Sequence, residues 1–219
     1  MNQYEQLNSN LSYLNLENIR QNLNEYISKV NDHKISFSEA LLDLTNKEIN
    51  YQHQLELERR IQRARFPIIK KIEEFDFNFQ PSINPQSISE LTTMSFLDKR
   101  ENVIFIGSPG VGKTHLAIGL GVKACEQGVR TLFINCHELM LRLQKAQEKQ
   151  HLERVIRRYE RYDLLIIDEL GYLPLATDDA NLLFQLINGR YERKSTIVTT
   201  NMPLSSWGVV LHNLAAAEA

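Results

Sequence analysis

Glycine is missing from the N-terminal part of this 219-residue chain, and the first one is Gly107. A stretch so long without glycine excludes glycine-dependent turns there and favours continuous helices. Cysteine is also scarce: Cys125 and Cys136 lie in apolar surroundings without the spacing of metal ligands. This excludes a disulfide scaffold, and we expect both thiols to be buried and reduced, as in a cytosolic protein.

Long apolar runs are lacking too. None approaches the roughly 20 residues that a membrane span needs, and the polar start MNQYEQLNSN has no signal-like segment. These absences predict a cytoplasmic protein without a membrane partner. The formal net charge is only -2, so nucleic acid could be bound only through local basic patches.

The first part of the chain predicts a helical domain. Apolar residues recur at three- and four-residue spacing over residues 11–30, which indicates a helix. Ser36 or Ser38 could cap a second, long helix, which should stop at Phe66-Pro67 because the residue before proline avoids the α region. A linker over 75–87 and a short helix over 88–99 follow. We therefore expect a helical N-terminal region at residues 1–80 that binds DNA or a partner protein.

Residues 81–219 alternate between strands and helices. Apolar runs predict strands at 102–106, 130–134, 162–169 and 195–200. Helices are expected between them, at 113–126, in two pieces over 137–161, and at 178–192. This order predicts an α/β fold with a parallel sheet covered on both faces.

The segment from Gly107 to Thr114 reads GSPGVGKT and fits the phosphate-loop pattern G-x-x-x-x-G-K-[ST] at every fixed position. It lies between a predicted strand and a predicted helix, where free backbone N–H groups and the helix dipole favour an anion. Lys113 is expected to reach the β- and γ-phosphates of ATP, and the Thr114 hydroxyl to ligate Mg²⁺. The predicted nucleotide-binding residues are Gly107, Ser108, Pro109, Gly110, Val111, Gly112, Lys113, Thr114 and His115.

A magnesium partner follows in the run LLIIDE, in which four aliphatic residues carry Asp168 to the end of a strand. Ligands of open α/β sheets bind at that end. We expect Asp168 to hold Mg²⁺ and Glu169 to act as the general base that polarises the attacking water.

Asn201 ends the strand STIVTT and could bind the γ-phosphate or orient the water, although asparagine before Met-Pro is also a common turn residue. A strand that ends in asparagine and lies between the phosphate-loop strand and the acidic strand is the layout of ATPases with a catalytic glutamate. No lysine-aspartate guanine motif indicates a GTPase. The sequence therefore predicts a P-loop NTPase that binds Mg-ATP.

Two basic clusters are candidates for DNA contact, with solvated faces or subunit packing as open alternatives. The first contains Arg59, Arg60, Arg63, Arg65, Lys70 and Lys71, without an acid among them. The second lies in the helices after the second strand, where Arg154, Arg157 and Arg158 are interspersed with acids.

Several aromatic residues also have two interpretations. Tyr162, Tyr172 and Trp207 could stack on bases, but packing in a core or interface is favoured. Phe75 and Phe77 could lie against the adenine ring, or could simply pin a linker to the core.

Four segments make the sequence resemble the IstB family, the ATP-binding helper proteins of bipartite insertion sequences, which are related to the DnaC helicase loaders. They are RRIQRARFPIIKKIEEFDF (59–77), ENVIFIGSPGVGKTHLAIGLGVKAC (101–125), RYDLLIIDELGYLPL (161–175) and LLFQLINGRYERKSTIVTTN (182–201). The resemblance implies an AAA+ ATPase that forms a homo-oligomer on duplex DNA, bends it, and recruits or stimulates a partner transposase.

The chain departs from this family after Trp207-Gly208. The family continues there with an arginine that reaches the neighbouring subunit's ATP site, whereas here no arginine follows Arg193. We therefore expect the C-terminal lid to be largely absent and hydrolysis to be impaired, since such an arginine can contribute roughly 10³–10⁵ in rate. Alternatives that remain open are a helicase loader and an ATP-binding interaction protein without turnover. A small-molecule kinase would need lid arginines that are not found.

Overall fold

The computed structural model describes residues 2–171 and 177–207. The chain divides into two compact units, 1–59 and 60–219, and the division falls inside one long helix. The sequence had placed the boundary near residue 80. Residues 60–80 instead belong to the second unit, because their apolar side chains pack against its core.

The first unit contains α1 (Gln3–Tyr13), α2 (Glu17–Asn31) and the start of α3 (Phe37–Ala64). The single helix predicted over 11–30 is wrong, since the chain turns between α1 and α2 at Asn15, whose φ is 57°. Asparagine tolerates this left-handed conformation better than most residues. A small apolar core holds these helices together, formed by Leu11, Ile19, Leu23, Tyr26, Ala40 and Leu44.

The start of α3 follows the predicted capping pattern. The backbone N–H of Glu39 donates to Ser36 Oγ at 3.2 Å, and the N–H of Ser36 donates to Glu39 Oε2 at 2.8 Å. Ser36 is therefore the capping residue, in a reciprocal arrangement with Glu39. The helix ends at Ala64, two residues before the Phe66-Pro67 position at which proline was expected to stop it.

A four-stranded parallel sheet forms the centre of the second unit. Its strands are β1 (Val103–Ile106), β2 (Thr131–Asn135), β3 (Leu164–Leu170) and β4 (Ser195–Thr200), in the order β1-β4-β3-β2. All three pairings are parallel. This confirms the predicted α/β fold and places β4 between the phosphate-loop strand and the acidic strand, as expected.

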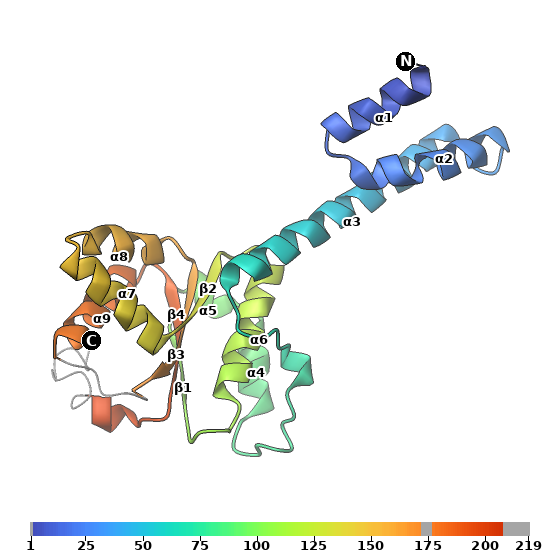
Figure 1. The fold of residues 1–219 in the computed structure, drawn as a ribbon. Coiled ribbons are helices and arrows are strands. Elements are labelled where there is room, and N and C mark those ends of the chain that lie inside the picture. The colour runs from blue at the N-terminus through green and yellow to red at the C-terminus, as the bar shows by residue number, and fades with distance from the viewer. Residues whose placement is uncertain (1, 172–176, 208–219) are drawn as a thin grey trace. The chain divides into compact units, whose positions relative to one another are not determined.

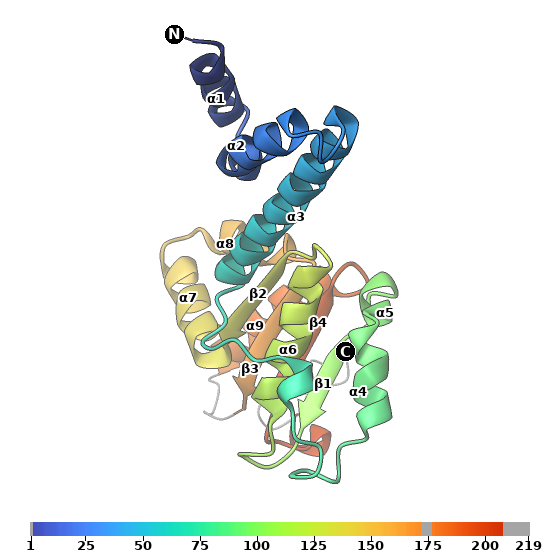
Figure 2. The same cartoon turned by 90° about the vertical axis from the view of Figure 1, so that its right-hand side faces the viewer.

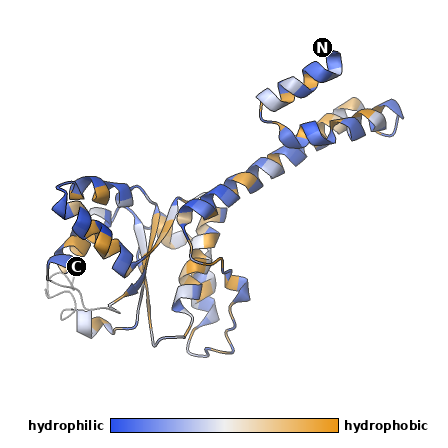
Figure 3. Ribbon diagram, viewed as in Figure 1, coloured by the Kyte–Doolittle hydropathy of each residue, from blue (hydrophilic) through white to orange (hydrophobic). Residues whose placement is uncertain are grey.

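Helices cover both faces of this sheet (Figures 1 and 2). One face carries α7 (Cys136–Glu148), α8 (Leu152–Glu160) and α9 (Thr177–Arg190), which share a core with Leu165, Ile167 and Val198 of the strands. The other carries α6 (Lys113–Glu126). Along α7 and α8, hydrophilic and hydrophobic residues alternate, as is typical of amphipathic helices at the surface of a domain (Figure 3).

The segment before the sheet differs from the prediction. The helix expected over 88–99 is two helices, α4 (Pro85–Thr92) and α5 (Ser95–Asp98), because Met94 between them has a φ of 62°. Part of the predicted linker is also ordered as α4, whose first turn is capped by Asn84 Oδ1 accepting from the N–H of Gln86 at 2.9 Å. Two short 3₁₀ helices, Ile72–Glu74 and Leu204–Ser206, complete the described elements.

Residues 65–77 form an extended strap that packs along α6, and glycines on that side make room for it. A Cβ added to Gly121 would lie 2.7 Å from Phe66 Cε1, and one added to Gly119 would lie 2.6 Å from Ile72 Cδ1. At the start of α6, a Cβ on Gly112 would lie 2.5 Å from Phe75 Cε2. Larger residues at these positions would displace the strap. The strap therefore packs against α6 over the length of the helix from Gly121 back to Gly112 in the phosphate loop.

Both cysteines are buried and free, as predicted. Burial raises the pKa of Cys125, and it raises the pKa of Cys136 to about 12, so both thiols stay protonated at neutral pH. Among the described helices, none is long and apolar enough to cross a bilayer.

Candidate nucleotide-binding site

The phosphate loop connects β1 to α6, in the context that its sequence pattern requires. Gly110 and Gly112 have φ values of 82° and 91°, which side chains with a Cβ rarely adopt. These conformations turn the backbone so that α6 begins at Lys113 directly after the loop. The free N–H groups of this first turn and the helix dipole make it a suitable place for an anion.

Lys113 lies across this loop. Its Nζ donates to the carbonyl oxygens of Gly107 at 2.8 Å and Ser108 at 2.9 Å. Partial burial lowers the pKa of Lys113, while the charges of Asp168 and Glu169 oppose that shift. The ammonium group is therefore held at the loop, facing the acidic end of β3.

Asp168 is 6% exposed and lies at the centre of a hydroxyl cluster. Its Oδ1 accepts from Thr114 Oγ1 at 2.9 Å and from Thr199 Oγ1 at 2.6 Å. The structure thus brings together the two residues predicted to serve Mg²⁺, one from α6 and one from β3. The sequence did not predict that Thr199 of β4 contacts Asp168. The only local indication was its position near the end of the strand STIVTT, two residues before Asn201.

Glu169 is exposed, unlike its neighbour, and has a φ of 64°. Its N–H donates to Thr199 Oγ1 at 2.9 Å, and its Oε2 accepts from Asn135 Nδ2 at 2.7 Å. Asn135 ends β2, and its Oδ1 also accepts from the N–H of His137 at the start of α7. Sequence reasoning missed Asn135, because no spacing rule relates the end of β2 to an acid 34 residues later.

A cavity of about 300 Å³ lies between the phosphate loop and the ends of β3 and β4. Asn201 lines it together with Lys113, Thr114 and Glu169, so the predicted polar group after β4 does lie beside the phosphate loop. The residues that line this cavity are Pro109, Gly110, Gly112, Lys113, Thr114, Glu169, Thr199, Thr200 and Asn201.

A second cavity, of about 330 Å³, also has Lys113 among its lining residues. Its lining is mixed: it contains apolar residues such as Ile83 and Leu116, polar residues such as Gln80 and Ser82, and the start of the phosphate loop. Lys113 lines both cavities, so they adjoin at this residue; the first also contains Glu169, and no described acid lines the second.

Phe75 and Phe77 do not line either cavity. Phe75 packs on Gly112 and contacts the ring of His115 edge to face at 5.3 Å, and Phe77 contacts Phe75 at 4.9 Å. His115 Nε2 is also 2.9 Å from the carbonyl oxygen of Lys71. These residues fasten the strap to the phosphate loop, so the alternative of a segment pinned to the core describes this geometry better than contact with a base.

The donor set at Asp168 fits Mg²⁺ rather than a metal bound by protein ligands alone. Among residues 2–171 and 177–207 there is no group of three or more His, Cys, Asp or Glu side chains that could hold a metal. One carboxylate and one hydroxyl suit Mg²⁺, which usually keeps several waters and substrate phosphates as ligands. Asp168 and Thr114 could therefore hold the ion together with a bound triphosphate.

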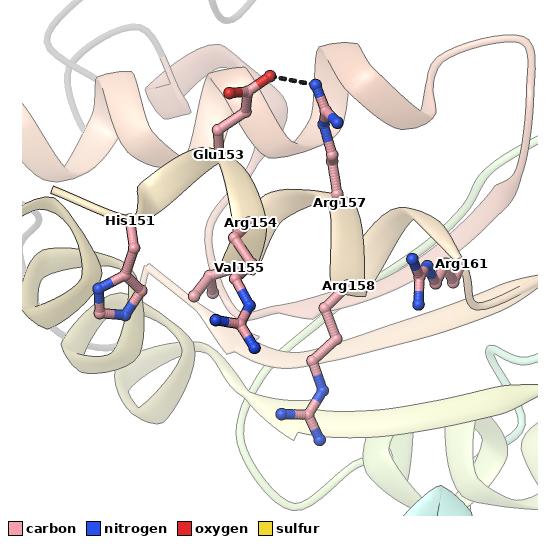
Figure 4. A pocket seen from close by; sticks show the side chains of 7 residues that line it. All are labelled: His151, Glu153, Arg154, Val155, Arg157, Arg158 and Arg161. Carbon is pink, nitrogen blue, oxygen red and sulfur yellow. Dashed lines mark hydrogen bonds and ion pairs between the residues drawn. The ribbon is translucent and has the colours of Figure 1, made fainter.

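The predicted basic residues separate in the structure. Arg59 belongs to the first unit, and Arg60 lies near Gly128 at the end of α6. Arg63, Lys70 and Lys71 do not line any of the cavities described here. Arg65, by contrast, lines a cavity with residues of α7 and α8, and the remaining predicted arginines, Arg154, Arg157 and Arg158, line an adjoining one (Figure 4). We refer to the two cavities together as the basic groove.

Tyr162 and Trp207 pack against the core formed by α7, α8 and α9. This agrees with the packing role that the sequence favoured over stacking on bases. Tyr172 and the residues after Trp207 lie outside the described part of the chain. The expectations about an absent lid and a missing arginine therefore stay predictions.

Together, the parallel sheet with β4 between β1 and β3, the phosphate loop and the acid pair at the end of β3 define a P-loop NTPase of the AAA+ class. The family of IstB-like ATP binding proteins matches residues 9–219, and the chain belongs to it. This confirms the resemblance on which the functional expectations rest.

Two relatives support the assignment across most of the chain. The protein described as an ATP-binding protein of insertion sequence IS232 from Bacillus thuringiensis subsp. berliner is 44% identical over 218 residues, covering 100% of this chain and 87% of the relative. The corresponding protein of IS21 from Pseudomonas aeruginosa is 40% identical, covering 94% and 79%. Among solved structures, the DnaC helicase loader is similar with a TM-score of 0.52 and 27% identity, over 62% of this chain and 85% of that one.

Proposed function

We propose that the chain is an ATP-hydrolysing helper protein of DNA transposition. The observation that carries the proposal is that Lys113, Thr114 and Glu169 line one cavity at the carboxyl end of a parallel sheet, with Asp168 bonded to Thr114. Membership of a family of insertion-sequence ATP-binding proteins supplies the biological setting. The expected location is the cytoplasm, where both ATP and DNA are available.

The phosphates of ATP would lie along the loop, with backbone N–H groups and Lys113 as donors. The base would enter the second cavity beside Ile83 and Leu116. Lys113 would then exchange its bonds to the carbonyls of Gly107 and Ser108 for phosphate oxygens. Mg²⁺ bound at Asp168 and Thr114 would neutralise charge on the phosphates.

Glu169 is the group placed to act on the water. Its exposed carboxylate would accept a proton from a water molecule whose oxygen attacks the γ-phosphorus, while ADP leaves with the bonding electron pair. Asn135 donates to this carboxylate and fixes its direction, so it is a positioning residue. Asn201, on the same cavity, could orient the water or contact the γ-phosphate.

We further propose that ATP favours assembly of several copies on duplex DNA, and that this assembly recruits or stimulates the transposase. Neighbouring subunits of AAA+ assemblies share the nucleotide, so occupancy would stabilise the oligomer and hydrolysis would loosen it. The candidate DNA contacts remain Arg59, Arg60, Arg63, Arg65, Lys70, Lys71, Arg154, Arg157 and Arg158.

Binding of labelled ATP to the full chain, followed by phosphate release, tests this site. Lys113→Ala is expected to weaken ATP binding by about 100-fold, because it removes the only ammonium group among the described residues that line the cavity beside Glu169. Unchanged affinity in this variant would refute the assignment. Phosphate release with and without DNA separates an ATPase from a protein that binds ATP without turnover.

The likeness to the DnaC helicase loader favours one second candidate, a helicase loader. Its sheet and phosphate loop would be the same, so the ATP site does not separate the two functions. Retention of a transposase, but not of a replicative helicase, on the immobilised full chain would decide for the transposition helper.

A further inference from the structure

The end of β3 is irregular at the acid pair. β3 pairs with β4 one residue to one as far as Ile167, and the register shifts before the last pair. Two residues of β3, Asp168 and Glu169, therefore oppose the single residue Thr199 of β4. This is a β-bulge, a feature that is rare between parallel strands and over-represented beside active sites.

The bulge gives Glu169 a backbone conformation that a glutamate rarely adopts. Its φ is 64°, in the left-handed region where a Cβ crowds the backbone. Such conformations cost free energy and persist only where the surrounding contacts over-determine them. The contacts that hold this bulge must therefore offset its cost.

The side chain of Thr199 supplies two of these contacts with one hydroxyl. Its Oγ1 accepts from the backbone N–H of Glu169 at 2.9 Å and donates to Asp168 Oδ1 at 2.6 Å. A threonine hydroxyl has one proton to donate, so the second bond commits that proton to the carboxylate. Thr199 is 1% exposed, so water has little access to either bond. One buried group thus holds the backbone of one acid and the side chain of the other.

This hydroxyl also determines which oxygen of Asp168 stays available. Thr114 Oγ1 donates to the same Oδ1 at 2.9 Å, so both hydroxyls bind one carboxylate oxygen. Among the described residues, no hydrogen bond to Oδ2 is found. Oδ2 is therefore the oxygen left for Mg²⁺ or for one of its water ligands, and Thr199 restrains the rotation of the carboxylate.

Thr200 completes the support of the bulge. Its Oγ1 donates to the carbonyl oxygen of Leu170 at 2.7 Å, and its own carbonyl accepts from the N–H of Gly107 at 3.2 Å. Side chains of β4 thus make hydrogen bonds that backbone groups would make in a regular ladder. Thr199 lies opposite the centre of the bulge, and its β-branched side chain has few rotamers, which keeps the hydroxyl in one place.

We propose that Thr199 is a positioning residue of the ATP site: it sets the bulge that presents Glu169 to the water, and it leaves Oδ2 of Asp168 available to Mg²⁺. This rests on the proposed function for the identity of the reaction. Thr199 acts through the two acids. β4 then contributes two groups to the site, Asn201 on the substrate side and Thr199 behind the acids.

Thr199→Val tests this assignment, because valine has nearly the same shape but no hydroxyl. Thr199→Ser keeps the hydroxyl without the β-branch, and Thr131→Val is a control that removes a buried hydroxyl from β2. Three quantities are measured on the full chain: single-turnover phosphate release, affinity for a non-hydrolysable ATP analogue, and binding of Mn²⁺ beside that analogue. Mn²⁺ is a paramagnetic substitute for Mg²⁺ and is followed by electron paramagnetic resonance. Thermal unfolding shows whether each variant is folded.

Thr199→Val should slow phosphate release and weaken Mn²⁺ binding, each by about 10–100-fold, as is typical when an outer hydrogen-bond partner of a metal ligand is removed. Affinity for the analogue without metal should stay unchanged, because the phosphate loop is intact. Thr199→Ser should recover most of both losses, and Thr131→Val should behave like the unmodified chain. A purely structural role would not separate nucleotide affinity from the metal-dependent steps.

Normal phosphate release with normal Mn²⁺ binding in Thr199→Val would overturn the proposal. Equal losses in Thr199→Val and Thr131→Val would overturn it too, as would a serine variant as impaired as the valine variant, since the hydroxyl would then not be the group that matters. If Thr199→Val does not fold, Thr199→Ala takes its place with the same expected losses.

Failure of this assignment and failure of the proposed function give different results. If the unmodified chain binds the analogue with Mg²⁺ but releases no phosphate from ATP, the ATPase falls, and Mn²⁺ binding still decides the role of Thr199. If the unmodified chain hydrolyses ATP and Thr199→Val matches it in phosphate release and in Mn²⁺ binding, the assignment falls and the ATPase stands.

Discussion

The phosphate loop and the basic groove are both suited to phosphate, but they use different parts of the chain. The loop offers backbone N–H groups and one lysine that is held by the carbonyls of Gly107 and Ser108. The basic groove offers the long side chains of Arg65, Arg154 and Arg158, which make no ion pair with another described residue. Backbone donors fix the geometry of one triphosphate, whereas flexible cations accept many positions of a polymer.

The two sites also differ in the groups that could make each of them selective for its ligand. Beside the loop, buried Asp168 and exposed Glu169 add carboxylates that could serve Mg²⁺ and a water molecule. The groove has tyrosine and leucine on its floor but no comparable acid pair, so charge dominates its binding. Each prediction below separates the two sites.

The largest effect is expected from Glu169→Gln. Removing the proposed general base should lower the rate of phosphate release by about 10²–10⁴, while ATP affinity and nucleic-acid binding stay nearly unchanged. Single-turnover hydrolysis with titrated ATP measures both quantities. A variant that hydrolyses at the original rate would show that another group activates the water.

The next largest effect is expected from the salt concentration, which should change the affinities of the two sites to different extents. If about four phosphates are contacted in the groove, affinity for duplex should fall by about 10² between 50 and 200 mM salt. ATP affinity should change far less over the same range, because backbone donors contribute much of that binding. Parallel titrations with each ligand measure both, and equal salt slopes would contradict the contrast.

Phe75→Ala tests the strap rather than the loop itself. Phe75 fills the space above Gly112 and contacts His115, so its loss should loosen the loop and weaken ATP binding by about tenfold. Phe79→Ala is a matched control, since that ring is 74% exposed. If both variants bind ATP equally well, the strap does not support the loop.

The smallest effect is a dependence on pH. The pKa of Lys113 is lowered by burial, so its charge is lost at a lower pH than that of an ordinary lysine. ATP affinity should therefore decrease by several-fold as the pH approaches about 10, while the arginines of the groove keep their charge. Isothermal titration at pH 8 and at pH 10 would detect the difference, and Lys113→Arg should abolish it.

Much of the fold could be read from local patterns. The predicted strand at 195–200 and the predicted helix at 113–126 agree with β4 and α6. Their signals are local, since a hydrophobic period of two or 3.6 residues, or a glycine after the last turn of a helix, can be recognised within a short segment of sequence. The errors lie at Asn15 and Met94, where left-handed backbone breaks an apolar pattern that continues through the turn. Such breaks depend on packing rather than on periodicity.

The sequence by itself determined the phosphate loop, the acid pair and the parallel order of the strands. In each, contiguous residues set a local backbone geometry or a buried strand. Only the tertiary structure decided three contacts. Asn135 donates a hydrogen bond to Glu169, the strap packs against the glycines of α6, and Arg65 lines a cavity with residues of α7 and α8. These contacts join residues far apart in the chain, and their positions follow from how helices pack on the sheet, which no spacing along the chain encodes.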